Sequence, residues 1–221
     1  MTELTGWIAE TAQEGIRDRG ISHWVISGGS TPIPLYNKLA HKAANIPWSK
    51  VCLYLADERD VYLADPLSNY RMVQDTLLNS PEVAYSRVYP WPVAGDPREA
   101  LAWYRQALSR VPTAKGYPTV DMALLGMGSD GHTASVFPGS PQLQSNGWVA
   151  YGPGPNAWRF TLTLSLLMNA RHVVFLATGP QKAARVRECL VEKNPDLPAA
   201  IVSQNALDVH WFLDTDSARE L

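Results

Sequence analysis

The sequence predicts an α/β fold in which a single domain, residues 1–221, contains a doubly wound, mostly parallel sheet flanked by helices. Apolar runs short enough for buried strands alternate with helical segments along the whole chain. Hydrophobic residues make up 46% of the chain and charged residues 18%, below the usual ~25%, as expected for strands buried on both faces. Several apolar runs end in glycine turns, which is where open α/β sheets bind ligands.

The elements follow one another as alternating helices and strands. A first helix is expected at 3–19 and a strand at 23–26, and Pro32 then fits the first position of a helix at 32–42. Further helices are expected at 67–78 and 97–110, and further strands at 51–55, 120–125, 173–177 and 209–213. Neither of the loops rich in proline and glycine, 138–147 and 152–155, is long enough for a domain linker.

The segment 121–138, DMALLGMGSDGHTASVFP, predicts a strand, a glycine turn and then a helix capped by Thr133. Asp130 and His132 lie in that turn, at the carboxyl end of the strand. An imidazole with a pKa near ~6.5 can take and return a proton at neutral pH. The alternative is a capping histidine that packs locally, but the glycine turn and the neighbouring aspartate favour a catalytic His132.

A second glycine turn follows the strand expected at 23–26. Its glycines would let backbone N–H groups approach a ligand closely, and the hydroxyls and the following helix offer donors to a phosphate. The turn has no lysine of a Walker loop, and an ordinary capped turn would have similar residues. The candidate binding residues are Gly28, Gly29, Ser30 and Thr31.

Polar residues also gather after the strand expected at 51–55. Their density suits binding of hydroxyl groups or polarisation of a carbonyl. Nearby Asp65, Pro66 and Ser68 are explained equally well by turn and helix-cap chemistry. The candidates in this segment are Asp57, Glu58, Arg59 and Asn69.

The glycines 126, 128 and 131 also spell GxGxxG, but a dinucleotide site is rejected. That site needs an acidic residue about 20 positions later, and residues 131–187 contain no Asp or Glu. The local excess of cations instead suits an anionic ligand, above all a phosphate, although Arg185 and Arg187 also fit a solvated helix surface. The cations are Arg159, Arg171, Lys182, Arg185 and Arg187.

Composition excludes several other classes. No apolar run approaches the ~18 residues of a membrane span, and no signal sequence is visible, so we expect a cytoplasmic protein without a membrane partner. Cys52 and Cys189 are far apart with no zinc-like spacing, which predicts neither metal nor cofactor. Eight scattered tryptophans and a net charge of −2 give no nucleic-acid footprint.

The chain resembles the 6-phosphogluconolactonases, within the family that also contains glucosamine-6-phosphate isomerases. Five motifs carry the resemblance in order between residues 27 and about 214: SGGSTP, ADERDVYLADPLSNY, LLGMGSDGHTASVFPG, RFTLTL and TGPQKA. The resemblance implies hydrolysis of 6-phospho-D-glucono-1,5-lactone to 6-phospho-D-gluconate in the oxidative pentose phosphate pathway. It implies a phosphorylated sugar lactone as the partner, no cofactor, and a monomer or small homo-oligomer.

The roles expected for the site residues follow from this reaction. His132 would be the general base, oriented by Asp130, and Arg59 or a backbone N–H would stabilise the oxyanion. Arg71 is an alternative to Arg59. Asp57 and Asn69 would bind sugar hydroxyls, and by resemblance Arg159 and Lys182 would clamp a phosphate against the Gly28 to Thr31 turn.

Two other functions fit parts of the sequence. The related isomerase/deaminases have a catalytic Glu five residues after the turn histidine, where this chain has Phe137, which cannot exchange protons. A non-catalytic sugar-phosphate sensor would normally carry a DNA-binding helix-turn-helix, for which the ~20 residues before the first strand are too few. Both alternatives are therefore less favoured than a lactonase.

Overall fold

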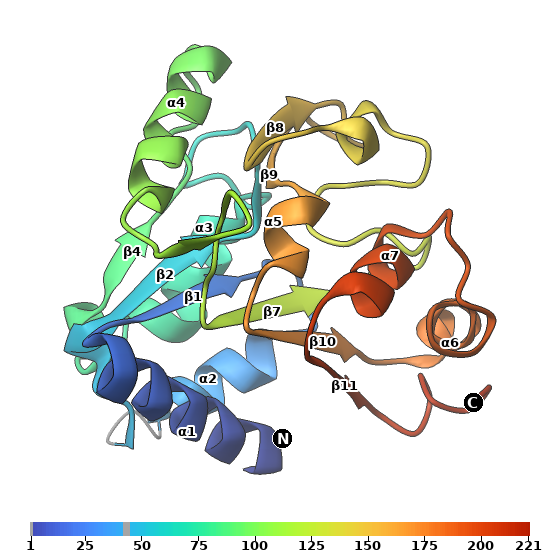
Figure 1. The fold of residues 1–221 in the computed structure, drawn as a ribbon, viewed down its shortest axis with the longest axis horizontal. Helices are drawn as coiled ribbons and strands as arrows, with labels where there is room; N and C mark the ends of the chain where they lie inside the picture. The colour runs from blue at the N-terminus through green and yellow to red at the C-terminus, as the bar shows by residue number, and fades with distance from the viewer. Residues whose placement is uncertain (1, 42–44) are drawn as a thin grey trace.

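The computed structural model describes residues 2–41 and 45–221 and is built on a six-stranded sheet (Figure 1). All neighbouring strands of this sheet pair in parallel, in the order β11-β10-β7-β1-β2-β4. The four inner strands are almost fully buried, as the composition indicated, whereas the edge strands β4 and β11 are only partly buried. The strands are β1 Ser22–Ile26, β2 Val51–Leu55, β4 Arg87–Tyr89, β7 Met122–Gly126, β10 His172–Ala177 and β11 Val209–Leu213.

Helices cover both faces of the sheet. Figure 1 shows α1 and α2 below the strands and α4, α5 and α7 above them. None of the described helices is long and apolar enough to cross a membrane. The α-helices are α1 Thr2–Arg19, α2 Ile33–His41, α3 Asn69–Val73, α4 Pro97–Leu108, α5 Leu164–Met168, α6 Ala183–Arg187 and α7 Pro198–Asn205.

A small antiparallel sheet, β3-β9-β8, contacts α4 through β8 and lies above the main sheet in Figure 1. Its strands are β3 Asp57–Arg59, β8 Val149–Gly152 and β9 Arg159–Leu162. Because β3 directly follows β2, the polar residues expected in a loop are instead held by a strand ladder. A further two-stranded hairpin is formed by β5 Thr113–Ala114 and β6 Tyr117–Pro118.

Aromatic side chains fill the core between α4 and β2. The rings of Trp91 and Tyr104 are fully buried and stack with centroids 3.6 Å apart. Trp91 Nε1 and Tyr104 Oη both donate to the carbonyl of Leu55, at 3.0 and 2.9 Å. Burial of these rings therefore leaves neither the indole N–H nor the phenol O–H unpaired. The same hydrogen bonds hold the end of β2, where the candidate site begins.

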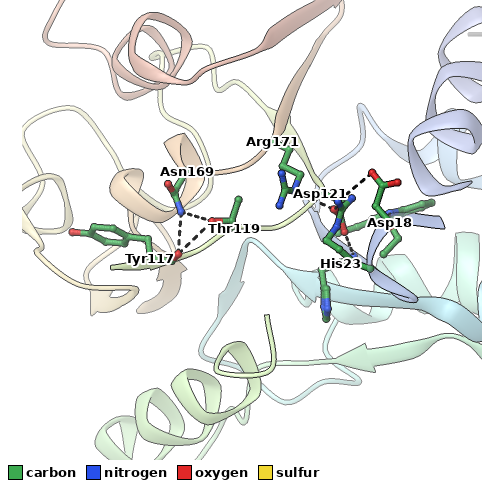
Figure 2. A network of polar contacts seen from close by, with 10 residues as sticks. Asp18, His23, Tyr117, Thr119, Asp121, Asn169 and Arg171 are labelled. Carbon is green, nitrogen blue, oxygen red and sulfur yellow. Dashed lines mark hydrogen bonds and ion pairs between the residues drawn. The ribbon is translucent and has the colours of Figure 1, made fainter. Parts of the chain in front are cut away.

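A buried carboxylate organises the amino end of the sheet (Figure 2). Asp121, only 2% exposed, accepts a hydrogen bond from His23 N at 2.7 Å and pairs with Arg19 at 2.6 Å and Arg171 at 3.5 Å. Nearby, Asn169 Nδ2 donates to the hydroxyl of Thr119 at 2.8 Å. These groups join α1, β1, β7 and the segment before β10, so they are structural.

The predicted fold class is confirmed, with three corrections to the elements. The helix expected after the 126–131 turn is absent, because Thr133 Oγ1 donates to the Gly126 carbonyl and Thr133 forms a bridge with Val136. The helix expected at 67–78 begins at Asn69 and becomes a π-helix over Gln74–Leu78. The helix expected to reach residue 110 ends at Leu108, and Lys42, expected to end the second helix, lies outside the described residues.

Candidate active site

A cavity of about 210 Å³ lies at the carboxyl ends of four adjacent strands, β10, β7, β1 and β2. The chain runs from β1 outward to β2 and β4, and from β7 outward to β10 and β11, so the cavity lies where the order reverses. Its lining consists of Ser27, Gly28, Gly29, Ser30, Thr31, Pro32, Asp57, Arg59, Asn69, Gly126, Met127, Gly128, His132, Ala134 and Lys182.

His132 and Asp130 form a hydrogen-bonded pair in the turn after β7. His132 Nδ1 lies 2.6 Å from Asp130 Oδ1, and His132 N also donates to that oxygen at 3.1 Å. The side-chain hydrogen bond from His132 lowers the pKa of Asp130 to about 2, so Asp130 is a carboxylate at neutral pH. An ionised carboxylate only accepts, so Nδ1 is the protonated nitrogen when the ring is neutral, and Nε2 then has the lone pair.

Gly128 leaves the space that this pair occupies. A Cβ on residue 128 would lie 2.1 Å from His132 Nδ1 and 2.4 Å from Asp130 Oδ1, far inside van der Waals contact. Gly128 N in turn donates to the His132 carbonyl at 2.8 Å, which closes the turn. Gly128 therefore allows His132 to occupy this position. The absence of a side chain at residue 128 serves packing of the pair and not the binding of a phosphate by the backbone.

The turn after β1 packs directly on Asn69. A Cβ on Gly28 would lie 1.9 Å from Asn69 Oδ1, so only glycine fits there. Gly29 has a φ of +91°, the left-handed region that favours glycine. Tyr36 Oη donates to the Ser27 carbonyl at 2.7 Å and anchors the turn to α2. Gly28, Gly29, Ser30 and Thr31 all line the cavity, as predicted.

Asp57 and Asn69 hold one another at the end of β2. Asn69 Nδ2 donates to Asp57 Oδ1 at 3.1 Å and to the Asp57 carbonyl at 3.0 Å. Ser135 Oγ donates to Asp57 Oδ2 at 2.5 Å, and the carboxylate is 7% exposed. Ser135 was missed by the sequence interpretation, although it belongs to the DGHTAS motif. The three side chains form a preorganised acceptor and donor set.

Glu58 was expected to face a ligand but is fully buried. Its carboxylate accepts hydrogen bonds from Asn69 N at 2.7 Å, Tyr70 N at 2.8 Å and Ser68 Oγ at 3.0 Å. Burial raises the pKa of Glu58 against these hydrogen bonds. The residue therefore joins β3 to the start of α3 and positions Asn69 without lining the cavity.

The structure separates the two arginines considered for the oxyanion. Arg59 lines the cavity, with Nη1 donating to the Leu67 carbonyl. Arg71 is not part of the lining; its Nη1 donates to the Ala64 carbonyl at 2.8 Å and its Nε lies 3.8 Å from Asp75. Arg59 is therefore the better placed of the two.

Of the two cations expected to bind a phosphate, Lys182 lines the cavity and Arg159 does not. Lys182, just after β10, lines the cavity, and burial lowers its pKa against the favourable charge of Asp130. Arg159 is opposite Arg59 in the β3–β9 ladder and is not part of the lining. It is 7% exposed, and both burial and Arg59 lower its pKa. Arg159 thus lies beside Arg59 in the ladder, outside the lining of the cavity.

Phe137, five residues after His132, contacts the catalytic candidate. Its ring centroid lies 4.6 Å from that of His132. The contact places an apolar ring, rather than a carboxyl group, beside the imidazole.

Comparisons with known proteins identify the family of the chain. A family model described as glucosamine-6-phosphate isomerases/6-phosphogluconolactonase matches residues 1–211. The chain is 34% identical over 213 residues to the 6-phosphogluconolactonase of Synechocystis sp., spanning 94% of this chain and 88% of that protein. It is 36% identical over 217 residues to that of Mycobacterium tuberculosis, spanning 92% and 86%.

Solved structures give the same result. The 6-phosphogluconolactonase from Trypanosoma brucei superposes with a TM-score of 0.86 at 29% identity, covering 100% of this chain and 94% of that one. A monomeric glucosamine-6-phosphate deaminase superposes with a TM-score of 0.80 at 20% identity, covering 99% and 96%, which shows a shared fold. On the match over residues 1–211, this chain belongs to the glucosamine-6-phosphate isomerase/6-phosphogluconolactonase family.

Proposed function

We propose that this chain hydrolyses 6-phospho-D-glucono-1,5-lactone to 6-phospho-D-gluconate in the oxidative pentose phosphate pathway. The observation that carries the proposal is one cavity holding an oriented His132, a glycine turn, Arg59 and Lys182. Relatives named 6-phosphogluconolactonase at 34% and 36% identity over most of the chain support the same activity.

In the proposed mechanism His132 activates water. Asp130 holds Nδ1–H, so Nε2 accepts a proton from a water molecule as its oxygen attacks C1 of the lactone. The tetrahedral oxyanion is stabilised by Arg59 or a backbone N–H, each well-placed donor contributing about 3–4 kcal/mol. The C1–O5 bond then breaks, and His132 returns the proton to the departing ring oxygen.

The substrate is positioned by the rest of the cavity. Asp57 and Asn69, already fixed by Ser135 and Glu58, bind sugar hydroxyls, and the turn from Gly28 through Thr31 binds the phosphate with Lys182. Arg159, which lies beside Arg59 in the β3–β9 ladder, is proposed as a second phosphate ligand. No step of this mechanism uses a cofactor or metal. The cytoplasmic location and the oligomeric state, a monomer or a small homo-oligomer, stay predictions from the sequence.

The test is a stopped assay of freshly generated 6-phosphogluconolactone near pH 7, with the wild-type chain, His132→Ala and no protein. Fast hydrolysis that is lost in His132→Ala supports the proposal, after subtraction of spontaneous ring opening. Hydrolysis at the background rate in all three samples would contradict it. Ammonia release from glucosamine 6-phosphate would point instead to the isomerase/deaminase activity, which Phe137 beside His132 disfavours.

A further inference from the structure

A second group of histidines and carboxylate lies at the amino end of the sheet, away from the candidate active site. His172 begins β10, Asp208 directly precedes β11, and His210 is on β11. Val173 pairs with Val209, and Val173 N donates to the Asp208 carbonyl, so His172 lies beside Asp208. Because side chains alternate along a strand, Asp208 and His210 face the same side as His172.

The donor atoms of these three residues converge. His172 Nδ1 lies 2.5 Å and His210 Nε2 lies 3.0 Å from the same oxygen, Asp208 Oδ2. One nitrogen from each ring and a carboxylate oxygen all lie within 4.8 Å of one another.

Helix α1 fixes the orientation of both rings. Trp7 contacts His172 edge-on, with centroids 5.4 Å apart and planes at 89°, and contacts His210 at 5.0 Å and 53°. Packing of this kind restricts the rotamers of the two imidazoles before any ligand arrives, which reduces the entropy that binding must remove.

The surroundings carry excess negative charge and leave room for solvent. His172 and Asp208 line a hollow of about 330 Å³, whose charged lining has four carboxylates and two guanidiniums. Both guanidiniums, those of Arg19 and Arg171, pair with the buried Asp121 (Figure 2). The carboxylates of the lining are Glu14, Asp18, Asp121 and Asp208.

We propose that His172, Asp208 and His210 bind a divalent transition metal ion of the Zn²⁺ type, at a site separate from the catalytic cavity. Two imidazoles and one carboxylate are ligands that Zn²⁺ accepts at about 2.0–2.2 Å. Around a tetrahedral ion with these bond lengths, two ligand atoms lie about 3.4 Å apart. The distances from Asp208 Oδ2 to His172 Nδ1 and to His210 Nε2 would therefore have to increase by less than about 1 Å. Water from the hollow completes the coordination.

The ion has a structural role in this proposal. It joins β10 to the edge strand β11. The hollow beside it lies at the amino end of the sheet, whereas the proposed lactone site lies at the carboxyl end. The chain's two cysteines are buried and do not compete for the ion. Binding to the native state alone would raise thermal stability by mass action.

The test is titration of the tag-free, chelator-treated chain with ZnCl₂ by calorimetry, repeated with Co²⁺ as a spectroscopic probe. His172→Ala and His210→Gln remove one ligand each, and Asp208→Asn keeps the shape of the carboxylate. Each should weaken Zn²⁺ binding at least roughly ten-fold, since even second-shell partners of a metal contribute 10–100-fold. Each should also lose the Co²⁺ d–d bands and the Zn²⁺-dependent rise in thermal midpoint.

Two histidine variants serve as controls. His41→Ala removes an exposed histidine on α2, and His132→Ala removes the active-site histidine, and both should bind Zn²⁺ as the wild type does. Wild-type affinity in Asp208→Asn and His210→Gln, or absence of Zn²⁺ binding by the wild type, would overturn the proposal. Loss of binding in His132→Ala alone would place the ion in the catalytic cavity and also overturn it.

Discussion

Two histidine–aspartate pairs lie at opposite ends of the same parallel sheet. His132 Nδ1 is 2.6 Å from Asp130 at the carboxyl end, and His172 Nδ1 is 2.5 Å from Asp208 at the amino end. The exposed fractions of the two imidazoles are 32% and 31%. Neither the distance nor the exposure therefore distinguishes a catalytic pair from a metal-binding or structural one.

The surroundings of the two pairs do distinguish them. His132 lines a cavity that also holds Arg59, Lys182 and a glycine turn, groups that suit an anionic substrate and a developing oxyanion. His172 instead shares its carboxylate with His210, and Trp7 packs against both rings. The neighbours of a histidine–aspartate pair thus determine which reaction or ligand the pair serves.

The largest expected effect separates the two pairs directly. His132→Ala should lower kcat for lactone hydrolysis by roughly 100-fold or more with little change in KM, as expected for a general base. His172→Ala should leave kcat within about two-fold, because that ring lies at the other end of the sheet. The measurement is initial rate against substrate concentration. An equal loss of kcat in both variants would show that the two pairs do not differ in function.

The next largest effect is expected at Gly128, the glycine that leaves space for His132 and Asp130. Gly128→Ala would place a Cβ 2.1 Å from His132 Nδ1 and displace the imidazole, so kcat should fall by about 10- to 100-fold. Gly6→Ala is the matched control, since a Cβ there has nothing within 4 Å. Circular dichroism should show both variants folded. Unchanged turnover in folded Gly128→Ala would mean that the observed position of His132 is not the catalytic one.

A smaller effect is expected at Lys182, the lysine that lines the cavity of the first pair. Lys182→Ala should raise KM for the phosphorylated lactone by about ten-fold through loss of a charge-assisted contact, and should leave a non-phosphorylated lactone unaffected. Arg185→Ala, whose guanidinium binds Glu188, is the control with the same loss of charge. A comparable rise in KM with both lactones would exclude Lys182 as a phosphate ligand.

The local parts of the fold and site were predictable from the sequence. Short apolar runs ending in glycine turns identify parallel strands and their carboxyl ends, and these placed His132, Gly28 and Asp57 around one cavity. The metal-binding candidates were missed because His172 and Asp208, 36 residues apart, meet only through the β10–β11 pairing. Each residue alone carries no signal in the chain.

The errors have a similar origin in tertiary contacts. Thr133 looked like a helix cap, but its hydroxyl bonds to Gly126 and Ala134 adopts a φ of +49°, which stops a helix from starting. Glu58 looked like a ligand-binding group, and only the fold shows its carboxylate buried against the start of α3. Strand β9 pairs with β3, about 100 residues earlier, so no local pattern revealed that Arg159 lies beside Arg59; its role as a phosphate ligand stays a prediction.

The smallest expected effect concerns the stability that the catalytic pair itself provides. The pKa of Asp130 is about 2 in the folded chain, below its ordinary value of 3.8, because His132 donates to it. A lowered folded pKa means that this stabilisation is present above about pH 4 and is lost as the pH falls toward 2. Since Asp130 is half exposed, solvent screening limits the contribution to less than about 1 kcal/mol.

Urea unfolding of the wild type and Asp130→Asn should therefore differ most above pH 4 and converge near pH 2. His132→Ala removes the donor rather than the acceptor, and its difference from the wild type should shrink over the same range. A difference that grows as the pH falls would show that Asp130 is not held ionised by His132. In that case the imidazole would lack the orientation that the proposed mechanism requires, whatever activity the chain displays.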